Sequence, residues 1–120
     1  MKRRRLSRSA EFERVYRRGR SRSNRWFVLH AFPRESSDGA RLGLSVGRRV
    51  GGAVDRNRVK RVLREAFWRH ADQLPDEQDF VIVARPEAGD LVEREGVDGV
   101  ARALEELLAV SGDARAEGGS

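Results

Sequence analysis

The sequence predicts an α+β fold, a small sheet covered by amphipathic helices. Three observations support this prediction. Residues 25–32 alternate with the period of a strand, residues 56–70 repeat apolar side chains at helical spacing, and residues 80–84 form a nearly continuous apolar run. Such a run is typical of a central strand that is buried on both faces. The 120 residues are enough for one domain with a real core, but not for two.

The two ends of the chain are predicted to lie outside the folded domain. Residues 1–8 form a flexible basic arm, which either becomes ordered against a ligand or only aids solubility. The domain covers residues 9–110, and residues 111–120 form a flexible tail.

A short helix is predicted at residues 10–18, with Ser9 as its N-cap. Phe12, Val15 and Tyr16 share one face of it at i, i+3, i+4 spacing. Core packing accounts for Phe12 and Val15. Tyr16 keeps two interpretations, a core position or a ring that stacks on a nucleic-acid base, because a basic run follows it.

Two strands are predicted next, at residues 25–32 and 41–46. The first places Trp26, Val28, His30 and Phe32 on one side and Phe27, Leu29 and Ala31 on the other. The second has an apolar side with Leu42, Leu44 and Val46 and a small, polar side with Arg41, Gly43 and Ser45. A phosphate backbone can approach such a polar side closely, although an ordinary exposed face has the same composition.

The second predicted helix is strongly basic. We take Asp55 as its N-cap, so that the helix starts at about Arg56. Its apolar stripe consists of Val59, Val62, Leu63, Ala66, Phe67 and His70, and the opposite stripe of Asn57, Lys60, Arg61, Arg64 and Trp68. Each cation in the first turn is destabilised by about 0.3–1 kcal/mol by the positive end of the helix dipole. A bound polyanion would reverse this cost, so the pattern favours binding to a polyanion over a basic face that is only solvated.

The C-terminal part is predicted to contain the strand at 80–84, an acidic loop at 87–96, and a final helix from Val97 to about Leu108. Charge is divided along the chain. Residues 1–71 hold 21 Lys/Arg and 6 Asp/Glu, whereas residues 72–120 hold 4 and 13. The electrostatic field of such a chain is positive on the side formed by residues 1–71, so nucleic acid is the favoured partner of that side.

Residue usage disfavours several classes of protein and site. There is no cysteine, hence no disulfide or thiolate metal site, and this fits a cytoplasmic location. No apolar run approaches the roughly 18–20 residues that span a bilayer, so we expect a soluble, unprocessed protein with no membrane partner. A protein nuclease would need His30, His70 and a Lys together, and nothing in the spacing assembles them. We therefore predict no catalytic and no metal-binding side chain.

The stretch RLGLSVGRRVGGAVDRNRVKRVLREAFW, with Arg56, Asn57 and Arg58 at its centre, resembles the signature of the protein component of bacterial ribonuclease P. The segments EFERVYRRGR, RWFVLHAF and FVIVARP match that family in order and spacing. The resemblance covers roughly residues 6–110. It implies a two-layer α/β sandwich in the order α-β-β-β-α-β-α, with a four-stranded mixed sheet, a third short strand near residues 47–52 and a left-handed βαβ crossover.

The resemblance also implies a function. In such complexes an RNA subunit with bound Mg²⁺ removes the 5′ leader of precursor tRNA, and the protein is an accessory subunit that binds the RNA and the leader. No metal held by the protein and no obligatory protein partner is implied. The positions implied to bind the RNA subunit are Arg48, Arg49, Arg56, Asn57, Arg58, Lys60, Arg61 and Arg64. Those implied to bind the leader are Phe12, Tyr16 and His30, the last standing where the family commonly has Tyr.

Two other functions remain open from the residues. The first is a structural RNA-binding module, such as a ribosomal or chaperone-like protein, which would have the same distribution of charge and the same kind of fold. The second is an autonomous nuclease that uses His30 and His70. Stimulation of precursor-tRNA cleavage by a ribonuclease P RNA distinguishes the first alternative, and RNA cleavage by the protein alone distinguishes the second.

Overall fold

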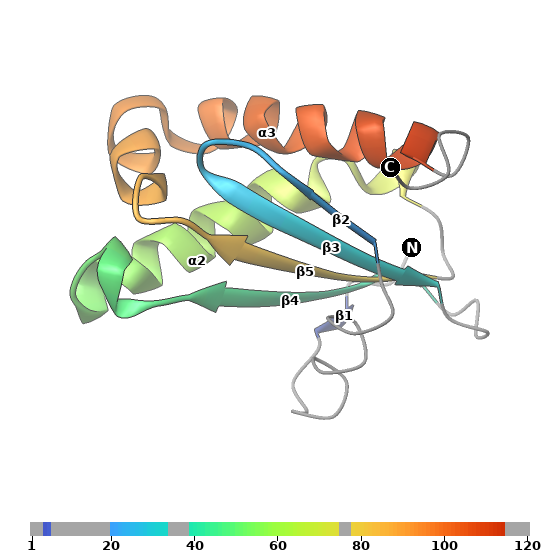
Figure 1. Cartoon of the computed structure of the whole chain (residues 1–120). Coiled ribbons are helices and arrows are strands. Elements are labelled where there is room, and N and C mark those ends of the chain that lie inside the picture. Colours follow the sequence, from blue (N-terminus) through green and yellow to red (C-terminus); the bar gives the residue numbers. More distant parts are fainter. Residues whose placement is uncertain (1–3, 6–19, 34–38, 75–77, 115–120) are drawn as a thin grey trace.

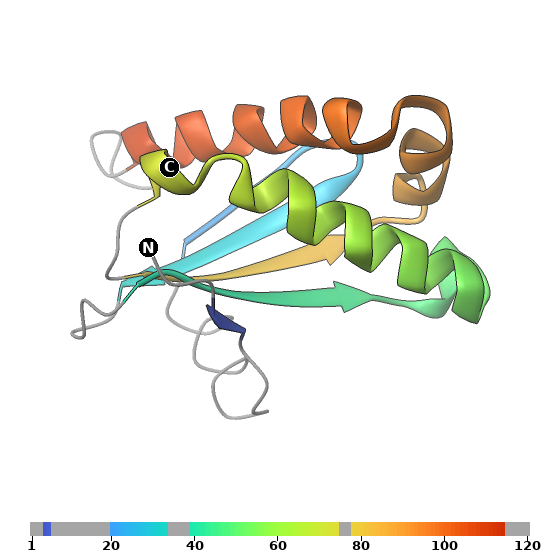
Figure 2. The same cartoon turned by 180° about the vertical axis from the view of Figure 1, so that it is seen from behind.

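One mixed sheet carries two long helices on the same face, so the molecule has two layers (Figures 1 and 2). The structure is a computed structural model that describes residues 4–5, 20–33, 39–74 and 78–114, and its layers, strands and helices are those of these residues. The α+β fold class and the two-layer arrangement predicted from the sequence are confirmed.

The sheet contains four strands of four to seven residues and one very short strand. β2 (Arg20–Ser23), β3 (Phe27–Pro33), β4 (Arg41–Val46) and β5 (Gln78–Ala84) are arranged in the order β4-β5-β3-β2. β5 runs parallel to β4 and antiparallel to β3, and its central place is the one that its apolar run predicts. The two-residue β1 (Arg4–Arg5) pairs with the outer edge of β4.

Some predicted segments lie wholly or partly outside the described residues. The predicted helix at 10–18, with Phe12 and Tyr16, is outside them. Of the predicted arm at 1–8, the structure describes only Arg4–Arg5, and these residues form β1. At the other end, the last helix extends to Ala114, four residues into the predicted tail.

The two helices are α2 (Ala53–Trp68) and α3 (Ala88–Ala114), the latter kinked at Gly96, whose φ of 63° lies in the left-handed region. In Figure 2 the helices face the viewer, β4 and β5 both run toward the right, and β5 lies above β4. The connection from β4 through α2 to β5 is therefore left-handed. The resemblance implied this unusual crossover, which ordinary βαβ geometry disfavours.

Two predicted boundaries are wrong. The third short strand is not near residues 47–52, where the structure has a 3₁₀ turn, η1 (Arg48–Val50); it is the polar strand β2, which carries no apolar signal. The acidic stretch at 87–96 is the first part of α3 and not a loop. Its buried residues Ala88, Leu91 and Val92 follow i, i+3, i+4 spacing, so an apolar helical face exists between the acidic residues.

The start of α2 also differs from the prediction. Gly52 is the N-cap, with no side-chain cap, and Asp55 lies in the first turn, where its carboxylate favours the positive end of the helix dipole. The first helical hydrogen bond runs from Arg56 N to Gly52 O, at 2.9 Å. The basic residues thus begin in the second turn, and the predicted opposition between first-turn cations and the dipole is wrong.

The core lies between the sheet and the helices. Val59, Leu63, Ala66 and Phe67 of α2 are buried, as the apolar stripe predicts. The Phe67 ring lies 5.3 Å from the ring of Phe80 in β5. Trp68, assigned to the opposite stripe, is instead buried, with its indole edge-on to Phe67 at 4.9 Å, because a large side chain at the helix end can reach back to the core.

A buried ion pair joins two neighbouring strands at the end where β5 begins. Arg41 of β4 donates from Nε and Nη2 to the two carboxylate oxygens of Asp79 of β5, at 2.8 and 2.7 Å. The Asp79 side chain is fully buried and that of Arg41 is 14% exposed. Such two-point geometry satisfies both charges and aligns the register of β4 with β5.

Candidate nucleic-acid interface

Five of the predicted RNA-binding residues form one surface of α2, which we call the basic stripe: Arg56, Asn57, Lys60, Arg61 and Arg64. Asn57 and Arg61 are exposed, whereas the other three are half-buried. Half-buried Lys and Arg side chains pack their stems on the protein and keep the charge near solvent. None of the four cations forms an ion pair with a described carboxylate.

Arg56, Lys60 and Arg64 follow one another at i, i+4 spacing on the side of α2 that is turned away from α3. Like charges at this spacing repel by about 0.2–0.5 kcal/mol per pair. The Nε of Arg56 is also shielded from solvent and has no hydrogen-bond partner among the described residues. The protein therefore does not balance the charge of this stripe with residues that the structure describes.

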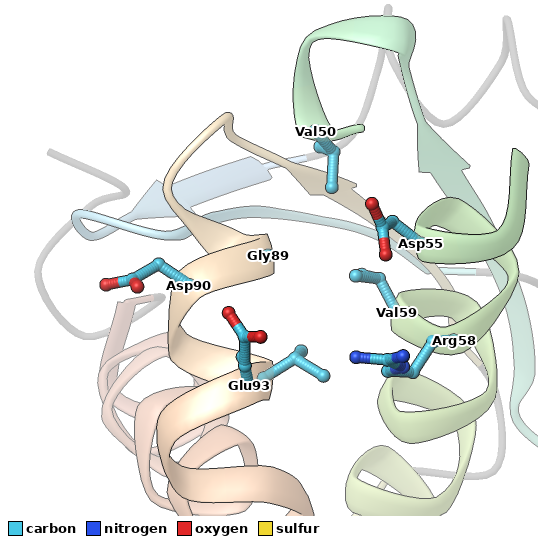
Figure 3. Close-up of a pocket in the computed structure, with 8 residues that line it drawn as sticks. Val50, Asp55, Arg58, Val59, Gly89, Asp90 and Glu93 are labelled. Atoms are coloured by element: carbon cyan, nitrogen blue, oxygen red, sulfur yellow. The ribbon is translucent and has the colours of Figure 1, made fainter. Parts of the chain in front are cut away.

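Arg58 is exposed but faces a different environment from the basic stripe. It lines a pocket of about 270 Å³ between the first halves of α2 and α3, together with Asp55, Asp90 and Glu93 (Figure 3). The Arg58 guanidinium and the Asp55 and Glu93 carboxylates point into the gap between the helices, whereas Asp90 points away. Two carboxylates beside one guanidinium make this pocket unsuited to a phosphate group.

Three acidic residues of α3, Asp90, Glu95 and Asp98, are paired with arginines outside the basic stripe. Asp90 accepts a hydrogen bond from Arg94 at 2.9 Å, and Glu95 accepts one from Arg102 at 2.9 Å. Arg69, just after α2, donates to Asp98 at 2.6 Å, and this hydrogen bond lowers the pKa of Asp98. The acidic helix therefore lies beside the basic one without neutralising the basic stripe.

The two other predicted RNA-binding cations, Arg48 and Arg49, lie on η1 between β4 and α2. Both are exposed, and neither forms an ion pair with a described carboxylate. The turn ends at Gly51, whose φ is 156°. A Cβ added there would lie only 2.8 Å from the Asp55 Cβ. Glycine at this position thus allows η1 to join the start of α2 directly.

His30 lies on the face of the sheet that is turned away from the helices, which we call the outer face. The register places it in a row across the strands with Ser21, Val81 and Gly43, beside a second row of Val28, Ser23, Val83 and Ser45. Burial lowers the pKa of His30 below 6.5, so its ring is neutral at pH 7. Val81 and Gly43 of this row are buried, so the partly exposed His30 ring and the exposed Ser21 are the members of the row that a ligand can reach. A neutral ring in such a row is suited to stacking rather than to ion pairing.

The structure separates the two histidines. His30 lies on the outer face, whereas His70 follows α2 on the helix side, with its Nε2 3.1 Å from the carbonyl oxygen of Ala101 in α3. The sheet therefore stands between them, and the hypothesis of a nuclease that uses this pair is wrong. His70, which the sequence places on the apolar stripe of the basic helix, is half-buried.

Two exposed arginines absent from the predicted sites, Arg25 and Arg85, lie where strands end, and only the sheet register brings them together.

Among the described residues, no group of three or more His, Asp or Glu side chains has a metal-binding arrangement. No described helix has the length and apolar character needed to cross a membrane.

A comparison with known protein families identifies the family of this chain. The family model described as Ribonuclease P matches residues 1–109. The chain belongs to the ribonuclease P protein family. The ribonuclease P protein component of Halalkalibacterium halodurans is 47% identical over 87 residues, which cover 72% of this chain and 73% of that protein. The component from Shouchella clausii is 48% identical over 90 residues, or 75% and 74% of the two chains.

Solved ribonuclease P proteins have the same fold. The protein from Staphylococcus aureus has a TM-score of 0.78 and 34% identity, and the match covers 89% of this chain and 94% of that one. The protein from Thermotoga maritima has a TM-score of 0.77 and 33% identity, covering 87% and 94%. Family membership associates the chain with the ribonuclease P complex, a nuclease of tRNA 5′ processing.

Proposed function

We propose that this protein binds the catalytic RNA subunit of ribonuclease P through the basic stripe and η1, and the 5′ leader of precursor tRNA through the outer face. In this role it is an accessory subunit, and hydrolysis of the phosphodiester is carried out by the RNA with Mg²⁺ that the RNA holds.

The basic stripe is the observation that carries the proposal. Three cations follow one another along one side of α2 without a described carboxylate, while Asp90, Glu95 and Asp98 of α3 are paired with other arginines. A polyanion placed along α2 removes the mutual repulsion of these cations and supplies acceptors for their guanidinium groups. Arg58, beside the pocket carboxylates, is expected to contribute less to binding than Arg61.

The leader assignment rests on the outer face. His30 is half-buried among small and apolar residues, and its neutral ring can stack on an unpaired base as the more common Tyr would. The two rows around His30 hold no charged side chain, which suits the bases of a single strand, while the basic stripe suits the backbone of a folded RNA. The other residues assigned to the leader, Phe12 and Tyr16, lie outside the described residues.

Reconstitution tests the proposal. The full-length protein is combined with a bacterial ribonuclease P RNA and precursor tRNA at low Mg²⁺, and leader removal is measured with and without the protein. We expect cleavage that depends on the RNA and is stimulated by the protein. Binding to RNA without any stimulation would instead support a structural RNA-binding module, and cleavage by the protein alone would support a protein nuclease.

The leader assignment has its own test. His30→Ala and Tyr16→Ala should weaken binding of precursor tRNA to the reconstituted complex and leave mature tRNA and the RNA subunit bound as before. Loss of RNA-subunit affinity in these variants would show that the outer face serves a different partner. His30→Tyr, which restores the ring type common in the family, should retain precursor binding.

A further inference from the structure

We infer that the RNA subunit contacts a second surface at the end of the sheet, formed by four arginines from three separate segments. These strand-end arginines are Arg25, Arg48, Arg49 and Arg85. Arg48 and Arg49 belong to the proposed RNA-binding residues, whereas Arg25 and Arg85 are new. The inference rests on the proposed function and extends its RNA-binding surface beyond α2 and η1.

The sheet register brings the segments together. Ala84, the last residue of β5, pairs with Val46 of β4 on one side and with Phe27 of β3 on the other. Arg85 follows directly after this row, and Arg25 lies in the turn just before it. η1 follows β4 after a single glycine. All three segments therefore leave the sheet at the same end, the left end in Figure 1.

Hydrogen bonds hold these segments in place. Arg85 N donates to Trp26 O at 2.8 Å, which ties the end of β5 to the β2–β3 turn. Within that turn, the Asn24 Oδ1 accepts from Trp26 N and Phe27 N at 3.0 and 2.9 Å, and the Asn24 Nδ2 donates to Ala103 O of α3 at 3.0 Å. Arg25 and Arg85 thus project from fixed backbone, so binding a ligand orders little more than their side chains.

The side chains of Arg25 and Arg85 are exposed and do not stabilise the described part of the fold through polar contacts. Neither forms a hydrogen bond or an ion pair through its guanidinium group there. The acidic residue next to them in sequence is Glu87, which is also exposed and forms no ion pair with a described residue. The pocket carboxylates of Asp55, Asp90 and Glu93 also lie near η1, together with Arg58 and Arg94, so this end of the sheet keeps a net positive charge. Guanidinium groups are suited to two-point contacts with phosphate.

The folded RNA subunit is the occupant that the position favours. The cluster includes η1, which joins directly to α2, so one rigid RNA surface can contact the basic stripe and the sheet end together. His30 lies three residues into β3 from Phe27, about 10 Å away along the strand, so the leader surface is separate from this cluster.

The test compares two double variants with the same loss of charge. Arg25→Ala with Arg85→Ala removes the new contacts, and Arg94→Ala with Arg102→Ala removes two exposed arginines from the acidic helix. Affinity of each full-length protein for the RNA subunit is measured against salt concentration, with wild type and Arg61→Ala in parallel. The melting temperature of every variant is recorded, and glutamine versions of the first pair are used if the alanine version is less stable.

We expect the Arg25/Arg85 double variant to bind more weakly and to lower the slope of log affinity against log salt by about 1.4–1.8, which corresponds to two lost phosphate contacts. The Arg94/Arg102 variant should keep the wild-type slope. The inference is overturned if both double variants behave alike, or if the Arg25/Arg85 variant loses only its preference for precursor over mature tRNA. Failure of wild type to bind the RNA, or an unchanged Arg61→Ala, would instead overturn the proposed function.

Discussion

Removing one partner of the buried ion pair between Arg41 and Asp79 should lower the free energy of unfolding by a large amount. Asp79→Ala removes the carboxylate that accepts two hydrogen bonds from Arg41 and leaves a guanidinium that is 14% exposed without this partner. Breaking a buried pair in this way costs about 3–5 kcal/mol. At about 4 °C per kcal/mol for a domain of this size, the melting temperature should fall by roughly 12–20 °C.

Thermal and urea unfolding of the full-length protein provide the assay. Asp90→Ala is the matched control, because it removes a carboxylate from the exposed pair with Arg94, where the expected loss is about 0–1 kcal/mol. The double variant Asp79→Leu with Arg41→Met should recover much of the lost stability, since no unpaired charge remains buried. If Asp79→Ala lost no more stability than Asp90→Ala, the reasoning about the buried pair would be refuted.

Three further predictions concern single residues. Gly51→Ala should destabilise the protein by about 1–3 kcal/mol, because its Cβ would meet that of Asp55 at 2.8 Å, whereas Gly47→Ala, with open space around it, should be nearly neutral in the same unfolding measurement. Since burial lowers the pKa of His30, the unfolded state binds its proton more readily, so the free energy of unfolding should fall as pH drops below about 6.5. The same titration of His30→Gln should be flatter, and equal slopes would contradict the assignment. Asn24→Ala should cost about 2–3 kcal/mol by removing the bonds that hold the β2–β3 turn, and Asn24→Asp, which keeps the acceptor, should lose less; equal losses would speak against this role.

Periodic patterns in the sequence were sufficient to predict the faces of the main elements. Alternation in β3 assigned His30 to the face opposite Phe27 and Leu29, and the structure confirms it. Helical spacing likewise identified most of the buried side of α2. Both patterns reflect burial against a single layer, which is a local property that a sequence records directly.

Features that depend on distant segments could not be predicted in this way. Arg41 and Asp79 are 38 residues apart and meet only through the register of β4 and β5. Strand β2 is polar because it is an edge strand, so no apolar alternation marks it. The start of α2 was misplaced because Asp55 is favourable both as a cap and in the first turn. Arg25 and Arg85 were likewise brought together by tertiary structure.

The central claim is that the basic stripe of α2 binds the catalytic RNA of ribonuclease P. The most direct measurement is the salt dependence of RNA-subunit affinity for wild type, Arg61→Ala and the control Arg102→Ala. The account predicts weaker binding and a slope lower by about 0.7–0.9 for Arg61→Ala, with the control unchanged. A slope for Arg61→Ala equal to that of wild type, with affinity preserved, would contradict it.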